Sequence, residues 1–191
     1  MADALDSARA AYGTERICVA CAGIAPAAKT VSRGNAHDAA LFARVIGINL
    51  VGCFNLASQS AAAMTANAPE GSDGERGVII HTASVAAYDG QIGQTAYAAS
   101  KGGVAGMVLP MARDLADKAV RVMAIAPGVF KTPMVEAFPQ EGQDAIGAQV
   151  PFPSRLGDPD EFAALAQHIV ENSMLNGGVI RLDGAIRMPP R

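Results

Sequence analysis

Tyr97 and Lys101 stand four residues apart in the run Tyr97-Ala98-Ala99-Ser100-Lys101, and Ser84 lies thirteen residues upstream of Tyr97. Residues four apart on a helix lie on the same face, so this spacing brings a phenol and an ammonium together. A nearby cation favours the phenolate, which lowers a tyrosine pKa from about 10 toward a range useful for acid–base catalysis. Ser84 adds a hydroxyl that can donate to a substrate oxygen. The alternative is a Tyr/Lys pair that only decorates a solvated helix face.

The composition is that of a globular protein that binds small molecules. The chain has 191 residues, of which 50% are hydrophobic and 17% are charged, and this length suits one domain with a sizeable core. Its net charge of −3, without a Lys/Arg cluster, argues against binding to nucleic acid or to an anionic membrane. No apolar run reaches the length of about eighteen residues that a membrane span needs, so we predict none.

Three cysteines, Cys18, Cys21 and Cys53, make an odd number, and no signal peptide precedes them, which favours a reduced, cytoplasmic location. Cys18 and Cys21 form a Cys-x-x-Cys motif. The surrounding residues 17–23 have the pattern of a buried strand, whereas a redox or metal role needs a loop or a helix start. We therefore expect both cysteines to pack as small hydrophobic side chains, and we predict no metal site.

Apolar runs alternate with helical patterns along the chain. Strands are predicted at residues 16–22, 78–82, 120–125 and 178–182. Helices are predicted at residues 2–12, 37–67, 95–117 and 159–171, the last one capped by Asp158 and started by Pro159. Such alternation predicts an α/β fold, with a parallel sheet covered by helices on both faces and all strand C-termini along one edge. Gly23, Ser84 and Pro127-Gly128 each follow a strand, and open α/β sheets bind ligands at that edge.

Five ordered motifs resemble the short-chain dehydrogenase/reductase family over nearly the whole chain. They are Cys21-Ala22-Gly23, Ile48-Asn49-Leu50, Thr82-Ala83-Ser84, Tyr97 with Lys101, and Ala126-Pro127-Gly128 followed by Thr132. Longer blocks at residues 102–115, 150–159 and 179–185 are most similar to the type-2 3-hydroxyacyl-CoA (type-10 hydroxysteroid) dehydrogenases within that family. Several motifs in order at compatible spacing are far more specific than one. The resemblance implies a Rossmann-like sheet and an oxidoreductase.

The resemblance also implies roles for catalytic residues. Tyr97 would be the general acid/base, Ser84 would position the substrate carbonyl or alcohol, and Lys101 would lower the phenol pKa and bind the nicotinamide ribose. Asn49 would hold a water that passes protons to Lys101; its alternative is to satisfy backbone groups at a helix irregularity. Hydride transfer to a carbonyl creates an alkoxide, which needs a nearby proton donor.

The cofactor implied by the subgroup is NAD. This preference over NADP comes from the resemblance alone, because the residue that selects between the two cofactors is not in this chain. Besides Tyr97 and Lys101, the resemblance assigns cofactor contacts to Gly23, Pro127, Gly128 and Thr132. Gly23 could instead simply end a strand, and Thr132 could be an ordinary helix-cap hydroxyl.

Gln91 resembles a position that contacts substrate in the acyl-CoA subgroup, although loop glutamines are usually only solvated. The apolar side chains of Met134, Val135, Phe138 and Phe152 suggest a substrate lid at about residues 131–153, or a satellite core as the alternative.

Two residues depart from the family pattern. His81 replaces an asparagine usual at the end of its strand, and we expect it to perturb local hydrogen bonds. Ala20 likewise stands where the family often has an asparagine.

The chain contains no Gly-x-x-x-Gly-x-Gly turn after a strand, which the family uses to bind the cofactor diphosphate. We therefore expect residues 1–191 to form one partial, N-terminally truncated Rossmann-type domain of about four strands, with the first strand as an apolar edge. Such an edge, with helix faces that resemble the family's dimer surface, predicts a homo-oligomer, a dimer or a tetramer.

Two functions follow. The first is an NAD-dependent oxidoreductase acting on a secondary alcohol such as a 3-hydroxyacyl-CoA or a steroid. The second is a catalytically silent dehydrogenase-like scaffold with a structural or interaction role.

Overall fold

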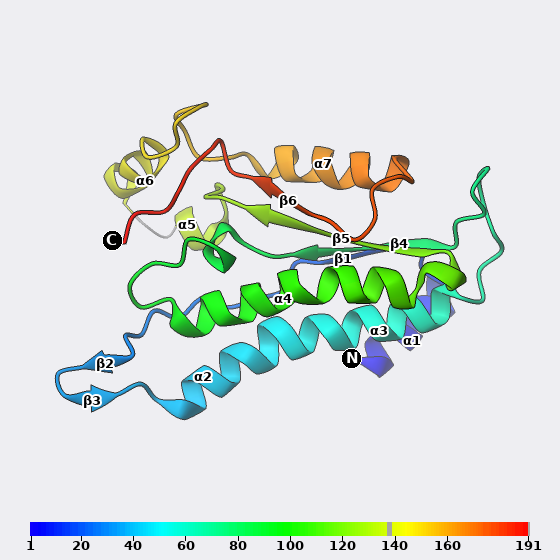
Figure 1. Ribbon diagram of the computed structural model, residues 1–191, viewed down its shortest axis with the longest axis horizontal. Helices are drawn as coiled ribbons and strands as arrows, with labels where there is room; N and C mark the ends of the chain where they lie inside the picture. The colour runs from blue at the N-terminus through cyan, green and yellow to red at the C-terminus, as the bar shows by residue number, and fades with distance from the viewer. Residues whose placement is uncertain (137–138, 191) are drawn as a thin grey trace.

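A parallel sheet of four strands forms the centre of the protein (Figure 1), seen in a computed structural model that describes residues 1–136 and 139–190. Its strands are β1 (Ile17–Ala20), β4 (Gly77–Thr82), β5 (Val120–Pro127) and β6 (Val179–Leu182), in the spatial order β1-β4-β5-β6. All three pairings are parallel. The predicted Rossmann-like α/β sheet of four strands is therefore confirmed, and the strand C-termini share one edge.

Helices cover both faces of the sheet, as predicted. On one face lie α3 (Gly52–Met64) and α4 (Thr95–Asp114), and on the other lies α7 (Pro159–Glu171) (Figure 1). The side chains of β4 alternate between two cores: Ile79 packs with α3 and α4, whereas Val78 and Ile80 pack with α7. This two-sided burial explains why the strands are continuous apolar runs.

The long helix predicted for residues 37–67 is one continuous stretch with an irregular turn. It consists of α2 (Ala39–Ile46), a π-helical turn η1 (Gly47–Val51) and α3. Asp38 caps its start, because its carboxylate accepts a hydrogen bond from the backbone N–H of Ala40 at 2.8 Å. The irregular turn carries Asn49, which is fully buried.

The helical stretch Ala39–Met64 is long and apolar enough to cross a membrane, judged by length and composition alone. Helices that pack inside proteins or between subunits meet the same criteria. The sequence predicted no span because it has no run of about eighteen apolar residues, whereas this stretch qualifies by its average hydropathy, which tolerates polar residues among the apolar ones.

Helix α7 is held at both ends. At its start, the Asp158 carboxylate accepts from the N–H of Asp160, and the Glu161 side chain accepts from the N–H of Asp158, which forms the predicted cap. At its end, the buried guanidinium of Arg121 from β5 donates to backbone carbonyls at the end of α7 and just beyond it, and pairs with the Glu75 carboxylate at 2.9 Å. Arg121 thus satisfies helix-end carbonyls that would otherwise lack partners.

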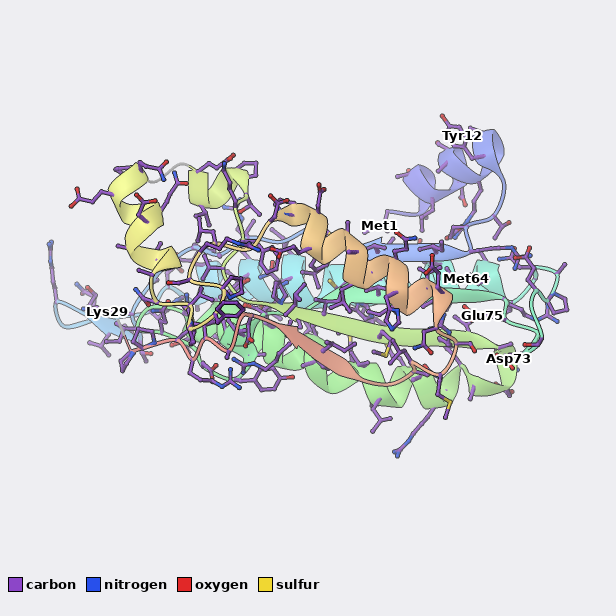
Figure 2. All side chains as sticks on the ribbon, turned by 90° about the horizontal axis from the view of Figure 1, so that it is seen from above. Met1, Tyr12, Lys29, Met64, Asp73 and Glu75 are labelled. Carbon is purple, nitrogen blue, oxygen red and sulfur yellow. The ribbon has the colours of Figure 1, made fainter. Side chains whose placement is uncertain are left out.

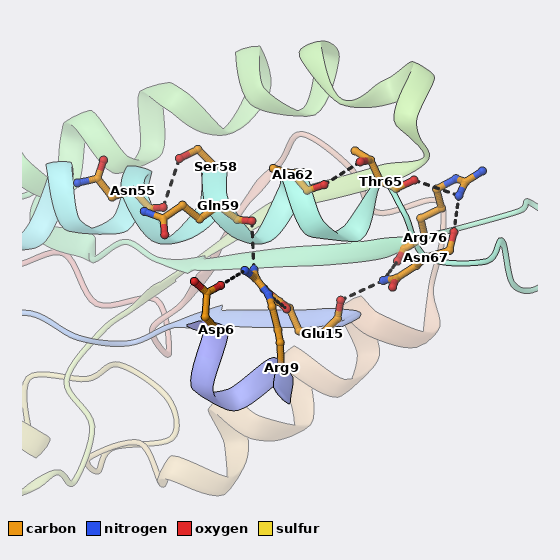
Figure 3. A network of polar contacts seen from close by, with 10 residues as sticks. All are labelled: Asp6, Arg9, Glu15, Asn55, Ser58, Gln59, Ala62, Thr65, Asn67 and Arg76. Atoms are coloured by element: carbon orange, nitrogen blue, oxygen red, sulfur yellow. Dashed lines mark hydrogen bonds and ion pairs between the residues drawn. The ribbon is translucent and has the colours of Figure 1, made fainter. Parts of the chain in front are cut away.

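Helix α1 (Ala2–Tyr12) lies beside the β1 edge and buries none of its residues (Figure 2). It ends at Gly13, whose φ of 83° is a left-handed conformation that favours glycine. Arg9 ties it to the body of the protein by donating to the Glu15 carboxylate at 2.6 Å and to the carbonyl of Gln59 at 3.2 Å (Figure 3). Asn67 adds a further tie by donating to the carbonyl of Glu15.

Strand β1 is an apolar edge, as predicted. Among the described residues it pairs only with β4, and the side chains of Ile17 and Val19 remain 51% and 40% exposed. Because β1 ends at Ala20, Cys21 lies outside the strand and is exposed, whereas Cys18 is buried in the core. The packing role predicted for the two cysteines is therefore correct for Cys18 and wrong for Cys21.

Some local structure was not predicted. A short hairpin, β2 (Val31–Ser32) and β3 (Asn35–Ala36), interrupts the expected loop, with Arg33 and Gly34 at positive φ in its two-residue turn. The remaining pieces are the 3-10 helices η2 (Val85–Ala87) and η3 (Ala116–Lys118) and the short helices α5 (Pro133–Glu136) and α6 (Gln140–Gly147).

Candidate functional site

The predicted catalytic residues gather at the C-terminal end of β4. Ser84 follows the strand directly and starts η2, where its hydroxyl accepts from the N–H of Ala86 at 3.1 Å. Tyr97 lies in the first turn of α4, where the Ser84 hydroxyl is near enough to affect the pKa of its phenol. The strand end and the helix start thus bring together two hydroxyls that are thirteen residues apart in the sequence.

Lys101 lies one helical turn after Tyr97, with its ammonium 5.8 Å from the centre of the Tyr97 ring. Its side chain is buried, and Nζ donates to the carbonyl of Thr82 at 2.6 Å. Burial lowers the pKa of Lys101, while the nearby thiols of Cys53 and Cys21 act in the opposite direction. The strand end therefore fixes the position of the cation beside the phenol.

The sequence-based expectation of a lowered Tyr97 pKa is wrong for the site as it stands. Burial raises the pKa of Tyr97, and the nearby Ser84 hydroxyl only partly opposes that rise. Desolvation disfavours the phenolate more than the neighbouring groups favour it. Tyr97 is consequently a neutral phenol at neutral pH, which is the form that donates a proton.

Asn49 joins three parts of the site. Its Oδ1 accepts from the N–H of Ile24 at 2.9 Å, and its Nδ2 donates to the carbonyl of Ile24 at 2.8 Å and to Ser100 Oγ at 3.1 Å. Ser100 in turn donates to the carbonyl of Tyr97 at 2.7 Å. The side-chain amide thus satisfies backbone groups from an irregular helical turn, which was the structural alternative considered for it. Its role in proton transfer stays a prediction.

Gly23 lies against Asn49 and Lys101. A Cβ added to Gly23 would stand 3.3 Å from Asn49 Oδ1 and 3.8 Å from Lys101 Nζ. The absence of a Cβ therefore lets the Gly23 backbone lie close to Asn49 and Lys101. Of the six residues expected to contact the cofactor, Gly23, Tyr97 and Lys101 are therefore brought together.

Pro127, Gly128 and Thr132 lie further along the same edge of the sheet. Gly128 packs against β6, since an added Cβ would stand 3.0 Å from the Cα of Asp183, and its N–H donates to the carbonyl of Leu182. Thr132 directly precedes α5, and its carbonyl accepts from Val135 at 2.8 Å. Their cofactor contacts stay predictions.

Gln91 has a partner that the sequence did not suggest. Its Nε2 donates to the carbonyl of Pro189, near the end of the chain, at 3.1 Å. Of the expected lid, Phe152 is 83% exposed. Phe138 lies outside the described residues, and the lid stays a prediction.

His81 is fully buried on the face of β4 that carries α3 and α4, between Ala20 of β1 and Ala124 of β5. Neither ring nitrogen has a hydrogen-bond partner among the described residues. Burial, and next the charge of Lys101, lower its pKa from 6.5 to about 4. His81 thus leaves two buried ring nitrogens without partners, and the expected change relative to an asparagine stays a prediction. Within the described part of the chain, no group of three His, Cys, Asp or Glu residues could hold a metal ion.

The sequence profile of the short chain dehydrogenase family matches residues 1–143. The chain belongs to this family. Its curated relatives include proteins named 3-hydroxyacyl-CoA dehydrogenase type-2 from Bos taurus, 56% identical, and from Homo sapiens, 54% identical, each aligned over 189 residues. Those alignments cover 98% of this short-chain dehydrogenase and 72% of each relative.

A more distant relative and a solved structure agree with this assignment. The 3-oxoacyl-[acyl-carrier-protein] reductase FabG of Thermotoga maritima is 36% identical over 144 residues, which is 74% of this chain and 55% of that protein. The crystal structure of 3-hydroxyacyl-CoA dehydrogenase type-2 from Mycobacterium avium superposes with a TM-score of 0.94 at 43% identity, and it is matched over 76% of its length by all of this chain. The fold of this short-chain dehydrogenase is thus that of an enzyme family.

Sequence reasoning missed two groups that hold the site together. The carbonyl of Thr82 anchors Lys101, and the hydroxyl of Ser100 joins Asn49 to the backbone of Tyr97. Ser100 lies inside the Tyr97–Lys101 run, so its position next to the lysine was a signal that could have identified it.

Proposed function

We propose that this enzyme transfers a hydride between NAD and a secondary alcohol or ketone, such as a 3-hydroxyacyl-CoA or a steroid. The observation that carries the proposal is the grouping of the Ser84 and Tyr97 hydroxyls with the Lys101 ammonium, which lies 5.8 Å from the centre of the phenol ring. The names of the bovine and human relatives support the acyl-CoA class of substrate. No observation favours a silent scaffold.

The residues present fit the nicotinamide end of the cofactor. Gly23 lies beside Lys101, whose Nζ makes one hydrogen bond among the described residues and so has further N–H groups to offer a ribose. When bound there, the nicotinamide supplies or accepts the hydride. We assign no residue to the diphosphate, because the chain contains no glycine-rich turn that follows a strand.

The protein's own contribution is to hold and move a proton. Ser84 orients the substrate oxygen by a hydrogen bond, and the Tyr97 hydroxyl donates a proton as negative charge develops on that oxygen during reduction. In the reverse direction the Tyr97 phenolate accepts the alcohol proton, and the Lys101 cation stabilises that phenolate. Because burial raises the Tyr97 pKa, oxidation depends on Lys101 and on alkaline conditions more than reduction does.

The test compares Tyr97→Phe with the unmodified enzyme, by following NADH absorbance with a 3-oxoacyl-CoA substrate. Loss of the proton donor should lower kcat by a factor of about a hundred or more. Tyr12→Phe makes the same chemical change on an exposed side chain and should leave kcat unaltered. An unchanged kcat in Tyr97→Phe would contradict the proposal. Titration of NADH by its fluorescence separates loss of cofactor binding from loss of chemistry.

We also propose that the enzyme forms a homo-oligomer. Support comes from large apolar side chains on the α2–α3 stretch and on α4 that keep between 37% and 49% of their surface exposed: Phe42, Ile48, Val51, Phe54 and Leu109. Exposed large apolar side chains on neighbouring helices are a common feature of subunit interfaces. Light scattering at micromolar concentration should give a mass of two or four chains, and a stable monomer would contradict the proposal.

The proposed cytoplasmic location rests on three free thiols and is tested by cell fractionation.

A further inference from the structure

The loop between Ser84 and Tyr97 is bonded to the end of the chain. We define this loop as residues 84–94 and the C-terminal strap as residues 183–190. Gln91 Nε2 donates to the carbonyl of Pro189 at 3.1 Å, and the N–H of Ile92 donates to the carbonyl of Pro190 at 3.0 Å. These partners are about a hundred residues apart in the sequence, and the two segments meet at the strand C-terminal end of the sheet (Figure 1).

Arg181, just before the strap, makes a second connection to the same loop. Its guanidinium pairs with the Asp89 carboxylate at 2.6 Å and lies over the Tyr88 ring at 5.4 Å. The same side chain pairs with Asp183 at 2.7 Å and donates to the carbonyl of Ile186 at 3.1 Å. Arg181 therefore binds the loop and the strap at the same time. Charge-assisted hydrogen bonds of this kind are stronger than hydrogen bonds between neutral groups.

The strap itself is anchored in the protein. Ile186 is buried, and its N–H donates to the carbonyl of Asp183 at 3.0 Å. Because the strap is fixed at Ile186, Pro189 and Pro190 are held in place, and their hydrogen bonds in turn hold the loop.

We propose that the C-terminal strap and Arg181 position the loop that carries Ser84 and Gln91, and thereby set the affinity for the acyl-CoA or alcohol substrate. Gln91 uses one N–H on Pro189, which orients its amide and leaves a second N–H and a carbonyl oxygen for a ligand. Its remaining side-chain contact, with Gln94 at 3.5 Å, is long. The strap acts through Gln91 and Ser84 and is a positioning element, since it donates no group to the reacting atoms.

The effect on substrate affinity rests on the proposed function. The mechanical link, by which the strap holds the loop through hydrogen bonds, does not. The main test uses the chain without its last three residues, which removes the acceptors of Gln91 and Ile92. Hydrogen exchange of the Ile92 N–H should accelerate at least about tenfold, because its partner carbonyl is gone. The KM for a 3-hydroxyacyl-CoA should rise about tenfold, while kcat changes less than about threefold and the Kd for NADH stays constant.

Arg181→Met should raise KM in the same way without removing any residue from the strap. Arg187→Met is the matched control, because among the described residues that exposed arginine bonds only within the strap, to Asp183 and Ile186, and should alter neither KM nor exchange.

Unchanged exchange at Ile92 in the shortened chain would overturn the mechanical link. Faster exchange with an unchanged KM would overturn the positioning of substrate. If the unmodified chain shows no turnover at all, the proposed function fails, and the exchange measurement still decides the link between strap and loop.

Discussion

The protein should lose unfolding free energy as the pH falls from about 7.5 to about 5, and replacing His81 with asparagine should remove most of that loss. The folded-state pKa of His81 lies near 4, below the value of 6.5 expected when the chain unfolds, because burial and the Lys101 charge disfavour the imidazolium. The neutral ring therefore contributes stability in full above about pH 6.5. Below that pH the unfolded chain binds the proton first, and the contribution disappears as the pH approaches 4.

The size of the effect follows from these two pKa values. A gap of about 2.5 pKa units corresponds to about 3 kcal/mol in total, of which about 2 kcal/mol is already lost at about pH 5. The pH window separates His81 from the acidic groups. Glu15, for example, has its pKa lowered to about 2, chiefly by its hydrogen bond with Arg9, so its contribution is lost only as the pH falls below about 4.5.

The assay is urea denaturation at the two pH values, for the unmodified chain, His81→Asn and His168→Asn. The quantity compared is the difference in unfolding free energy between the two pH values, which does not depend on how well asparagine packs at position 81. His168 is exposed on α7, so its removal should leave that difference as in the unmodified chain. If His81→Asn lost as much stability as the unmodified chain, His81 would not be the buried neutral base described above.

Three further predictions concern stability and the pH dependence of catalysis. Arg121→Leu should lower the unfolding free energy by about 3–5 kcal/mol, because it leaves its partly buried carboxylate partner Glu75 and the backbone carbonyls at the end of α7 unpaired. Arg155→Leu breaks an ion pair between side chains that are 50% and 43% exposed and should cost much less stability than Arg121→Leu; equal losses in urea denaturation would refute the burial argument. Gly77→Ala should cost about 1–3 kcal/mol in the same assay, since its Cβ would stand 2.9 Å from a backbone oxygen beside β1, and wild-type stability would contradict this. The rate of alcohol oxidation should rise from neutral to alkaline pH, because the raised Tyr97 pKa keeps the phenolate scarce at neutral pH, and a pH–rate profile that stays flat over this range would contradict that role.

The parts of the fold that were predicted correctly depend on neighbours along the chain. Apolar runs bounded by glycine and proline predict β4 and β5, and Asp158 followed by Pro159 predicts the start of α7, because burial pattern and helix capping act over a few residues. The hairpin at residues 31–36 was missed, since Arg33-Gly34 is a weaker turn signal than Asn-Gly or Asp-Gly.

Within the site, the sequence determined which groups are available, and the spacing of Tyr97 and Lys101 on one helix face was enough to bring phenol and ammonium together. Only the tertiary structure decided what surrounds them. Asn49 bonds to Ile24, and Gln91 bonds to Pro189 from 98 residues away, and no local pattern encodes such partners. The direction of the Tyr97 pKa was likewise beyond the sequence, because desolvation is a property of the folded surroundings and here outweighs the neighbouring groups.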